Sequence, residues 1–111
     1  MALIKTKKDN SPITLSVTIK YGHYGTTTIN LNGNPIKTIG GNFKDFVLGT
    51  NNSLKHNTIS VVTSVLVTNA ELNTEVEFDV VGGENSDKDT SNIKADNNVN
   101  YVPHYNGYTF I

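Results

Sequence analysis

The chain has 111 residues, of which 36% are hydrophobic and 17% charged, and its formal net charge is −1. It lacks cysteine, tryptophan, arginine and glutamine. The missing cysteine excludes a disulfide scaffold, a thiolate metal site and a cysteine nucleophile. A near-zero charge without arginine argues against nucleic acid as a partner. Leu, Ile, Val and Phe account for 31 residues, which is enough for one domain over residues 1–111 with a modest core.

The first half of the chain reads as strands separated by turns. Apolar and polar residues alternate over 12–21, the clearest strand pattern in the sequence. Residues 26–31 are rich in β-branched side chains, and we expect them to pair with 12–21 as a hairpin or meander. Asn32-Gly33 predicts a tight turn, because these residues accept positive φ, and 36–39 then forms a short return strand.

The middle of the chain contains one ambiguous segment and two clear strands. Residues 43–49 fit either a short strand or one helical turn, because Phe43 and Phe46 are three residues apart. The stretch 58–68 is apolar on both faces and is predicted to lie centrally in a sheet. Residues 76–80 alternate Val and Phe with acidic residues, which indicates a strand with one wet acidic face.

The last third is less regular. Residues 84–100 are polar and predict a long loop, while the aromatic-rich 101–111 predicts one or two terminal strands, with Asn106-Gly107 as a candidate hairpin turn. About seven short strands and no long helix indicate an all-β fold. We expect a small antiparallel β-sandwich of immunoglobulin-like size, with an open barrel as the alternative.

The polar loop supplies oxygen ligands at alternate positions, as calcium loops do. The candidate metal ligands are Glu84, Asp87, Asp89 and Ser91. The ligand pattern is incomplete, because Asn92 and Asn98 stand where a calcium loop of the helix–loop–helix type has Gly and Glu. No cofactor is therefore expected, and Ca²⁺ is the ion that this loop would take if it binds one.

Tyrosines gather in two parts of the sequence that become neighbours if the first and last strands pair. Tyrosine offers a flat apolar ring with a hydrogen-bonding tip, which suits the recognition of sugars and peptides. The alternative is that the rings cap the ends of a small core. The candidate ligand-binding residues are Tyr21, Tyr24, Tyr101, His104, Tyr105 and Tyr108.

The sequence offers no activated catalytic group, so the protein is not expected to be an enzyme. It has no G-x-S-x-G elbow and no phosphate-binding loop. We expect a non-catalytic interaction module that binds a protein partner or self-associates, and an open strand edge is one surface for that role. The alternatives are a carbohydrate-binding, lectin-like domain that uses the tyrosines and a calcium-assisted adhesion or binding module.

No apolar run reaches the ~18 residues of a membrane span, and the three lysines among the first eight residues precede no apolar signal segment. We therefore expect a cytoplasmic protein, one exported without a cleavable leader, or a mature secreted form.

Overall fold

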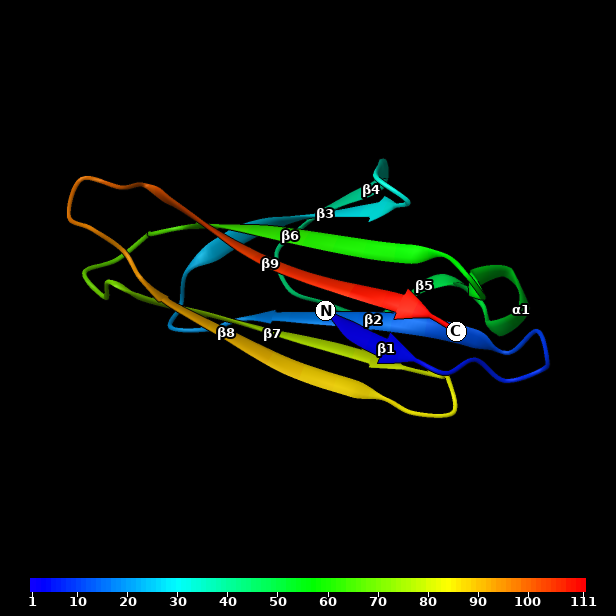
Figure 1. Cartoon of the computed structure of the whole chain (residues 1–111). Helices are drawn as coiled ribbons and strands as arrows, with labels where there is room; N and C mark the ends of the chain where they lie inside the picture. The colour runs from blue at the N-terminus through cyan, green and yellow to red at the C-terminus, as the bar shows by residue number, and fades with distance from the viewer.

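The computed structural model describes all residues, 1–111, as nine strands and one helical turn in two packed sheets (Figure 1). One sheet has the strand order β1-β9-β6-β3-β4 and the other β5-β2-β7-β8. The elements are β1 (Ala2–Ile4), β2 (Pro12–Ile19), β3 (Tyr24–Leu31), β4 (Asn34–Gly40), β5 (Phe43–Thr50), α1 (Asn51–Leu54), β6 (Thr58–Leu66), β7 (Asn73–Val81), β8 (Asp87–Lys94) and β9 (Tyr101–Phe110).

The expectation of an all-β sandwich is confirmed, and the open barrel is not observed, because the two sheets share no strand. All neighbouring strands are antiparallel except β1 and β9, which pair in parallel over three residues. The chain forms nine strands rather than about seven. The two additional strands are β1 and β8, which lie at sheet edges and lack a clear apolar alternation. β1 is only three residues long, although its Ile4 is fully buried in the core, and β8 is mostly exposed.

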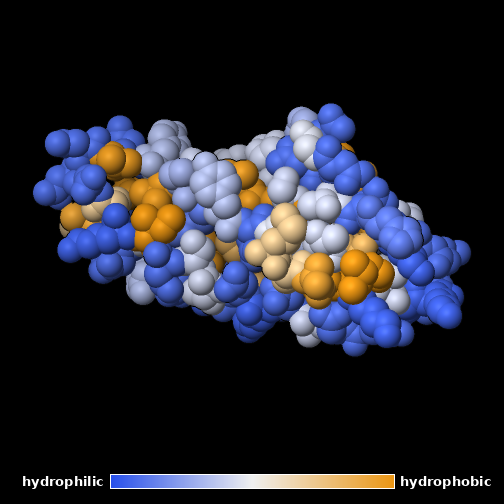
Figure 2. All heavy atoms as spheres, in the orientation of Figure 1, coloured by the Kyte–Doolittle hydropathy of each residue, from blue (hydrophilic) through white to orange (hydrophobic).

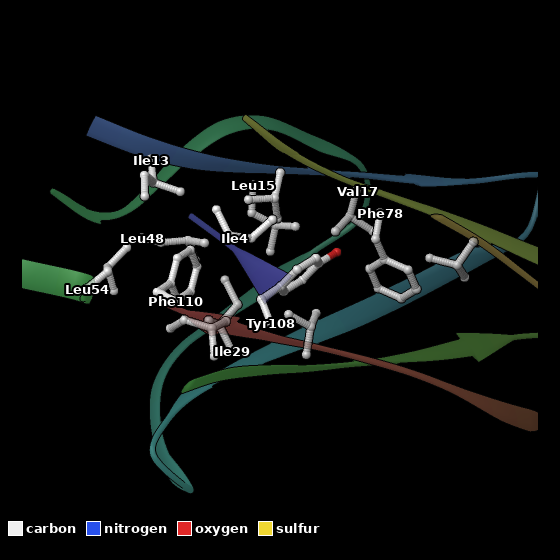
Figure 3. Close-up of a cluster of buried hydrophobic side chains, with 14 of the residues drawn as sticks. Ile4, Ile13, Leu15, Val17, Ile29, Leu48, Leu54, Phe78, Tyr108 and Phe110 are labelled. Atoms are coloured by element: carbon white, nitrogen blue, oxygen red, sulfur yellow. The ribbon is translucent and has the colours of Figure 1, made fainter. Parts of the chain in front are cut away.

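The core lies between the sheets and consists of the inward rows of the alternating strands (Figure 3). From β2, Ile13, Leu15 and Val17 are fully buried, and Phe78 of β7 lies beside them in the same sheet. Tyr108 and Phe110 fill the opposite side from β9. Strand alternation places every second side chain on the core side, so the period-two pattern determines which residues are buried.

Strands β2 and β3 do not form the expected hairpin. β2 lies in the four-stranded sheet and β3 in the five-stranded sheet, so the chain crosses the sandwich between them. Tyr21 and Gly22 make this crossing with positive φ angles of 59° and 72°. Local alternation predicts each strand but contains no information on which sheet the strand joins, so pairing of sequence neighbours was the wrong default.

Residues 84–100 are not one long loop, because Asp87–Lys94 form strand β8 along the edge of β7. Each residue from Asp87 to Lys94 faces a partner in β7, from Val80 back to Asn73. Most β8 side chains are exposed, so the strand overhangs the core and needs no apolar row. Hydrophobic periodicity therefore could not reveal it.

The terminal segment is one continuous strand, and Asn106-Gly107 is not a turn. Strand β9 pairs with β6 without interruption, from Thr58 opposite Thr109 to Leu66 opposite Tyr101. Inward and outward side chains therefore alternate along the whole of β9.

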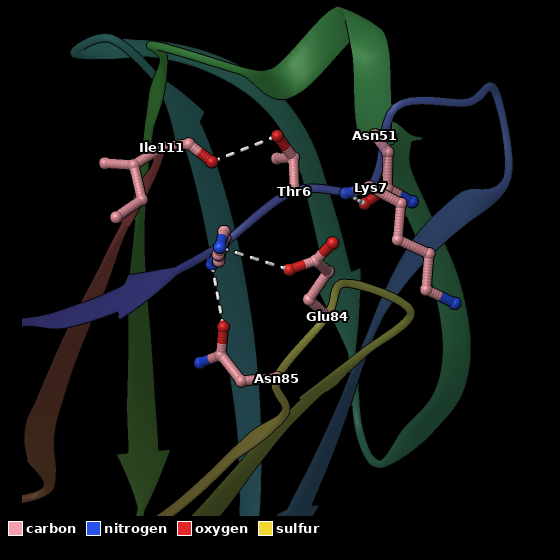
Figure 4. Close-up of polar contacts among 7 residues, drawn as sticks. Thr6, Lys7, Asn51, Glu84, Asn85 and Ile111 are labelled. Atoms are coloured by element: carbon pink, nitrogen blue, oxygen red, sulfur yellow. Dashed lines mark hydrogen bonds and ion pairs between the residues drawn. The ribbon is translucent and has the colours of Figure 1, made fainter.

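Asparagine side chains attach the N-terminal segment to the turns that follow β5 and β7 of the four-stranded sheet (Figure 4). The buried Asn51 accepts a hydrogen bond from the Lys7 N–H at 2.8 Å and donates to the carbonyl oxygens of Ser11 and Gly82. Asn85 accepts from the Lys5 N–H at 2.7 Å. These bonds satisfy backbone groups of an irregular segment that would otherwise be costly to bury.

The turn after β7 depends on a glycine. Gly82 has φ +114°, and a Cβ there would clash with the carbonyl oxygen of Pro12 and lie 3.0 Å from Ile13 Cα. We predict that Gly82→Ala lowers the free energy of unfolding by about 3 kcal/mol, because the backbone at Pro12 and Ile13 has to move to make room for the new Cβ.

The matched control is Gly33→Ala, at φ +86° with no atom within 4 Å of the new Cβ. This substitution should lower the free energy of unfolding by only about 1–2 kcal/mol, which is the cost of a left-handed backbone conformation for a residue with a Cβ. Urea denaturation of both variants measures the two changes in the free energy of unfolding. Equal changes would contradict the clash between a Cβ at position 82 and the Pro12 carbonyl oxygen.

Candidate functional site

The outer faces of the two sheets differ in charge. Outside the four-stranded sheet, β7 presents Glu75, Glu77 and Asp79 toward the solvent side, and β8 presents Lys88 and Lys94 beside them. Lys88 Nζ and Glu77 Oε1 form an ion pair at 3.4 Å. This face has the mixed charge of an ordinary solvated sheet surface, as predicted for 76–80.

The outer face of the five-stranded sheet has a different character, because none of its outward side chains on β3, β6 and β9 is charged. We call this surface the tyrosine face. Its members are Tyr24, Thr26, Thr28 and Asn30 of β3, Thr58, Ser60, Val62, Ser64 and Leu66 of β6, and Tyr101, Pro103, Tyr105, Gly107 and Thr109 of β9.

Three of the predicted ligand-binding tyrosines lie on this face. Tyr24 and Tyr101 both pair with Leu66, from opposite sides, so they stand two strands, or about 10 Å, apart. Tyr105 follows Tyr101 along β9 by about 13 Å. Their exposed fractions are 53%, 59% and 68%, respectively. In Figure 2, pale atoms and orange, hydrophobic groups alternate along the middle of the molecule, whereas deep blue atoms gather toward its two ends.

A hollow of about 510 Å³ lies beside Tyr105. Ser60, Val62 and Gly107 line it from the tyrosine face, and Met1 and Asp89 contribute from the rim. Gly107 has no side chain at the position where Thr109 and Tyr105 carry theirs, and the Met1 side chain lies over it. The hollow is a surface depression that joins an exposed aromatic ring to hydroxyl and carboxylate groups.

Two predicted ligand-binding residues, His104 and Tyr108, lie inside the protein and are unavailable to a ligand. Both are fully buried on the inward row of β9. The sequence pattern predicted a hairpin turn at Asn106-Gly107, and a turn there would break the alternation that identifies His104 and Tyr108 as inward residues. In one continuous strand, His104 and Tyr108 share the parity of Val102 and Phe110, which marks them as core residues.

His104 joins the two sheets through hydroxyl groups. Its Nε2 lies 2.8 Å from Thr74 Oγ1 on β7, and its Nδ1 lies 2.8 Å from Ser91 Oγ on β8. The Thr74 hydroxyl donates to the carbonyl oxygen of Ile93, so it accepts from His104 Nε2–H. His104 Nε2 therefore carries a hydrogen, and a hydrogen bond joins Nδ1 to Ser91 Oγ.

A second pair of hydroxyls extends this polar layer across the five-stranded sheet. The buried Thr27 and Thr63 hydroxyl oxygens lie 2.8 Å apart, and Thr63 is the register partner of His104. The layer is paired throughout, as buried polar groups require.

The remaining two tyrosines lie away from this face. Tyr108 accepts a hydrogen bond from Asn106 Nδ2 at 3.0 Å, and burial, with smaller effects of nearby Asp87 and Asp89, raises the pKa of its hydroxyl. Tyr21 is half-exposed in the crossing between β2 and β3, outside the strands that form the tyrosine face.

The four candidate calcium ligands do not converge on one point. Glu84 lies in the turn before β8 and pairs with Lys5 Nζ at 3.5 Å, while Ser91 is bonded to His104. Asp87 and Asp89 stand on the exposed edge strand. The structure contains no group of three or more His, Asp or Glu side chains arranged to hold a metal ion.

The free strand edges carry features that oppose pairing with another chain. Lys88 and Lys94 lie on β8, and Pro35 and Lys37 on β4. Strand β5 is interrupted by register shifts in its pairing with β2.

The exposed part of β9 is protected in another way. Pro103 offers no N–H, and the Gly107 N–H already donates to Asn106 Oδ1 at 2.8 Å. These features favour the face of the sheet over its edges as the surface for contact.

Sequence reasoning missed the partners of the tyrosines on this face, chiefly Ser60, Val62, Leu66 and Gly107. The alternation in 58–68 indicated that both rows would be covered, whereas Val62 and Leu66 are only partly buried. The absence of charge at even-numbered positions in 58–66 was the available signal.

Comparison of the chain with protein-family models, curated proteins and solved structures found no match in any of the three. The only helix is one turn long, and no helix has the length and apolar character needed to cross a membrane.

The environment of His104 predicts a pH-dependent stability. Burial holds the pKa of this imidazole below its usual 6.5. As the pH falls below 6.5, the unfolded chain takes up a proton that the folded protein resists. The free energy of unfolding should therefore fall, by at most about 1.4 kcal/mol per pH unit.

Urea denaturation at pH 7.5 and 5.5 measures this loss. His104→Gln should abolish most of it, whereas His56→Asn, at an exposed position, should retain it. A His104→Gln protein with an unchanged pH dependence would assign the effect to another group.

Proposed function

We propose that this protein is a non-catalytic binding module and that the tyrosine face is its contact surface. The observation that carries the proposal is the absence of charge from every outward position of β3, β6 and β9, combined with three exposed tyrosines. Cores of protein interfaces are depleted in charged residues and enriched in tyrosine, as this surface is.

The contrast with the opposite sheet supports the proposal. The chain has 19 Lys, Asp and Glu residues, and strands of both sheets are exposed on their outer sides. Solubility alone favours charge on both outer faces. Binding a ligand would remove water from this face, and a charge buried without a partner is costly. A face that is covered by a ligand is therefore expected to lack charge.

The proposal is non-catalytic because the outward positions of β3, β6 and β9 carry no carboxylate, imidazole or amine. Both ring nitrogens of His104 are bonded inside the core. The acidic residues of β7 lie on the opposite outer face, beside lysines.

Two classes of ligand suit an uncharged aromatic face. The first is a protein partner or a second copy of this chain, which would bury the face as an interface. The second is carbohydrate, which the hollow beside Tyr105 and the surrounding hydroxyl groups favour. The calcium-assisted module is not proposed, because the acidic residues form no shared site.

A single charge at the centre of the tyrosine face should abolish binding. Ser64 lies on β6 between Thr26 and Pro103. We predict that Ser64→Lys leaves the fold intact and weakens binding at least tenfold, because a buried unpaired ammonium costs well over ~1.4 kcal/mol. Light scattering of the purified protein and affinity capture from the native source measure self-association and partner binding.

The matched control is Thr90→Lys, which places the same charge on β8 opposite Glu77. This variant should bind as the native protein does. The proposal is wrong if Thr90→Lys abolishes binding while Ser64→Lys retains it.

A further inference from the structure

Building on the proposed function, we infer that the ligand of the tyrosine face is a neutral carbohydrate chain that lies along β9 and places one sugar ring in the hollow beside Tyr105. A protein partner and a second copy then become alternatives that the same experiment tests.

Strand β9 presents a row of ring surfaces along its outward side. Tyr101, Pro103 and Tyr105 occupy alternate positions, so they follow one another at about 6.6 Å on the same side of the sheet. Tyr101 and Tyr105 are each more than half exposed. Flat apolar rings in a straight row offer successive stacking surfaces to an extended chain of sugar rings, whose faces carry C–H groups.

The row ends at the hollow. Beyond Tyr105, Gly107 continues the outward positions of β9 without a side chain, and Ser60 is its partner on β6. The volume of about 510 Å³ is adequate for one or two sugar rings, since small-molecule sites of ~300–1,000 Å³ are the norm.

Polar groups at the hollow match the hydroxyls of a sugar. Ser60 supplies a hydroxyl that both donates and accepts, and Asp89 supplies an exposed carboxylate that accepts. Asp89 takes part in neither of the two ion pairs of the protein. Its Oδ1 accepts a hydrogen bond from the Thr90 N–H at 2.9 Å, which leaves Oδ2 to accept from a sugar hydroxyl. Its charge at the rim disfavours acidic sugars, and the uncharged face offers no cation to attract them.

The face is less suited to a protein partner than to carbohydrate. Its large apolar side chains, Val62 and Leu66, are partly buried, so they offer little protruding area for an anchor. Most other members are hydroxyl-bearing. The three exposed tyrosines suit either kind of ligand, and the many hydroxyl groups between them favour a polyhydroxylated chain.

Affinity electrophoresis in gels containing soluble neutral polysaccharides tests the inference. The probes are hydroxyethylcellulose, starch, xylan and galactomannan, with polygalacturonate as the acidic comparison. We expect at least one neutral polymer to retard the native protein and polygalacturonate to leave it unretarded. Isothermal titration with oligosaccharides of the retaining polymer then gives the dissociation constant.

Two substitutions should weaken that constant about tenfold or more. Tyr105→Ala removes a stacking surface, and Gly107→Val fills the hollow. The added Cβ at Gly107 would lie 3.2 Å from Met1 Cε and 3.7 Å from the Ile59 carbonyl oxygen, so the flexible Met1 side chain has to shift by a few tenths of an ångström while the backbone stays in place. Tyr105→Phe keeps the ring and should stay within about threefold, and Val47→Ala, an exposed apolar position on β5, should leave binding unchanged. Melting temperatures establish that each variant is folded.

Each other outcome overturns the inference. It is wrong if no neutral polymer retards the native protein, or if Tyr105→Ala and Gly107→Val bind as tightly as the native chain. Should Ser64→Lys still abolish self-association or partner capture in that case, the tyrosine face remains the contact surface and only the carbohydrate is excluded. If neither kind of binding depends on the face, the proposed function fails as well.

Discussion

The packing of two sheets through their inward rows of side chains is the constraint on which the rest of this structure depends. Each strand has to turn one row of side chains toward the other sheet. The polar side chain of His104 falls on such a row, and it can be buried there because Thr74 and Ser91 form hydrogen bonds with its two ring nitrogens. The hydroxyl–imidazole layer connects β9 with β7 and β8 where apolar contacts alone would not fix the register.

Once the inward rows are fixed, selection for function can act on the outer rows. The outer row of β7 carries acids next to the lysines of β8, while the outer rows of β3, β6 and β9 carry none. Proline, lysine and register shifts protect the free edges from pairing. Protected edges beside an uncharged face favour contact through side chains over strand addition, which is why we propose the tyrosine face as the contact surface.

The sequence alone predicted strands whose inward row is continuous. Ile13, Leu15, Val17 and Ile19 alternate with polar residues and are all buried. The prediction failed where burial is not periodic. Strand β8 overhangs the core and shows no apolar row, and β9 carries aromatics on both of its faces, so Tyr105 and Tyr108 looked equivalent although one is exposed and the other buried. Three of the six candidate ligand-binding residues reached the surface site, brought together by β6, which no local pattern places between β3 and β9.

The most direct test of the account observes the five tyrosines separately, since the chain has no tryptophan. Protein labelled with ¹³C only in its tyrosine rings gives five sets of NMR signals, which are followed through a dilution series and through titration with the neutral polysaccharides. Binding at the tyrosine face should shift the signals of Tyr101 and Tyr105 most, with Tyr24 next, and leave those of the buried Tyr108 and the turn residue Tyr21 in place. Binding that shifts only Tyr21, or that leaves every ring signal unchanged, would contradict the claim that the tyrosine face is the contact surface.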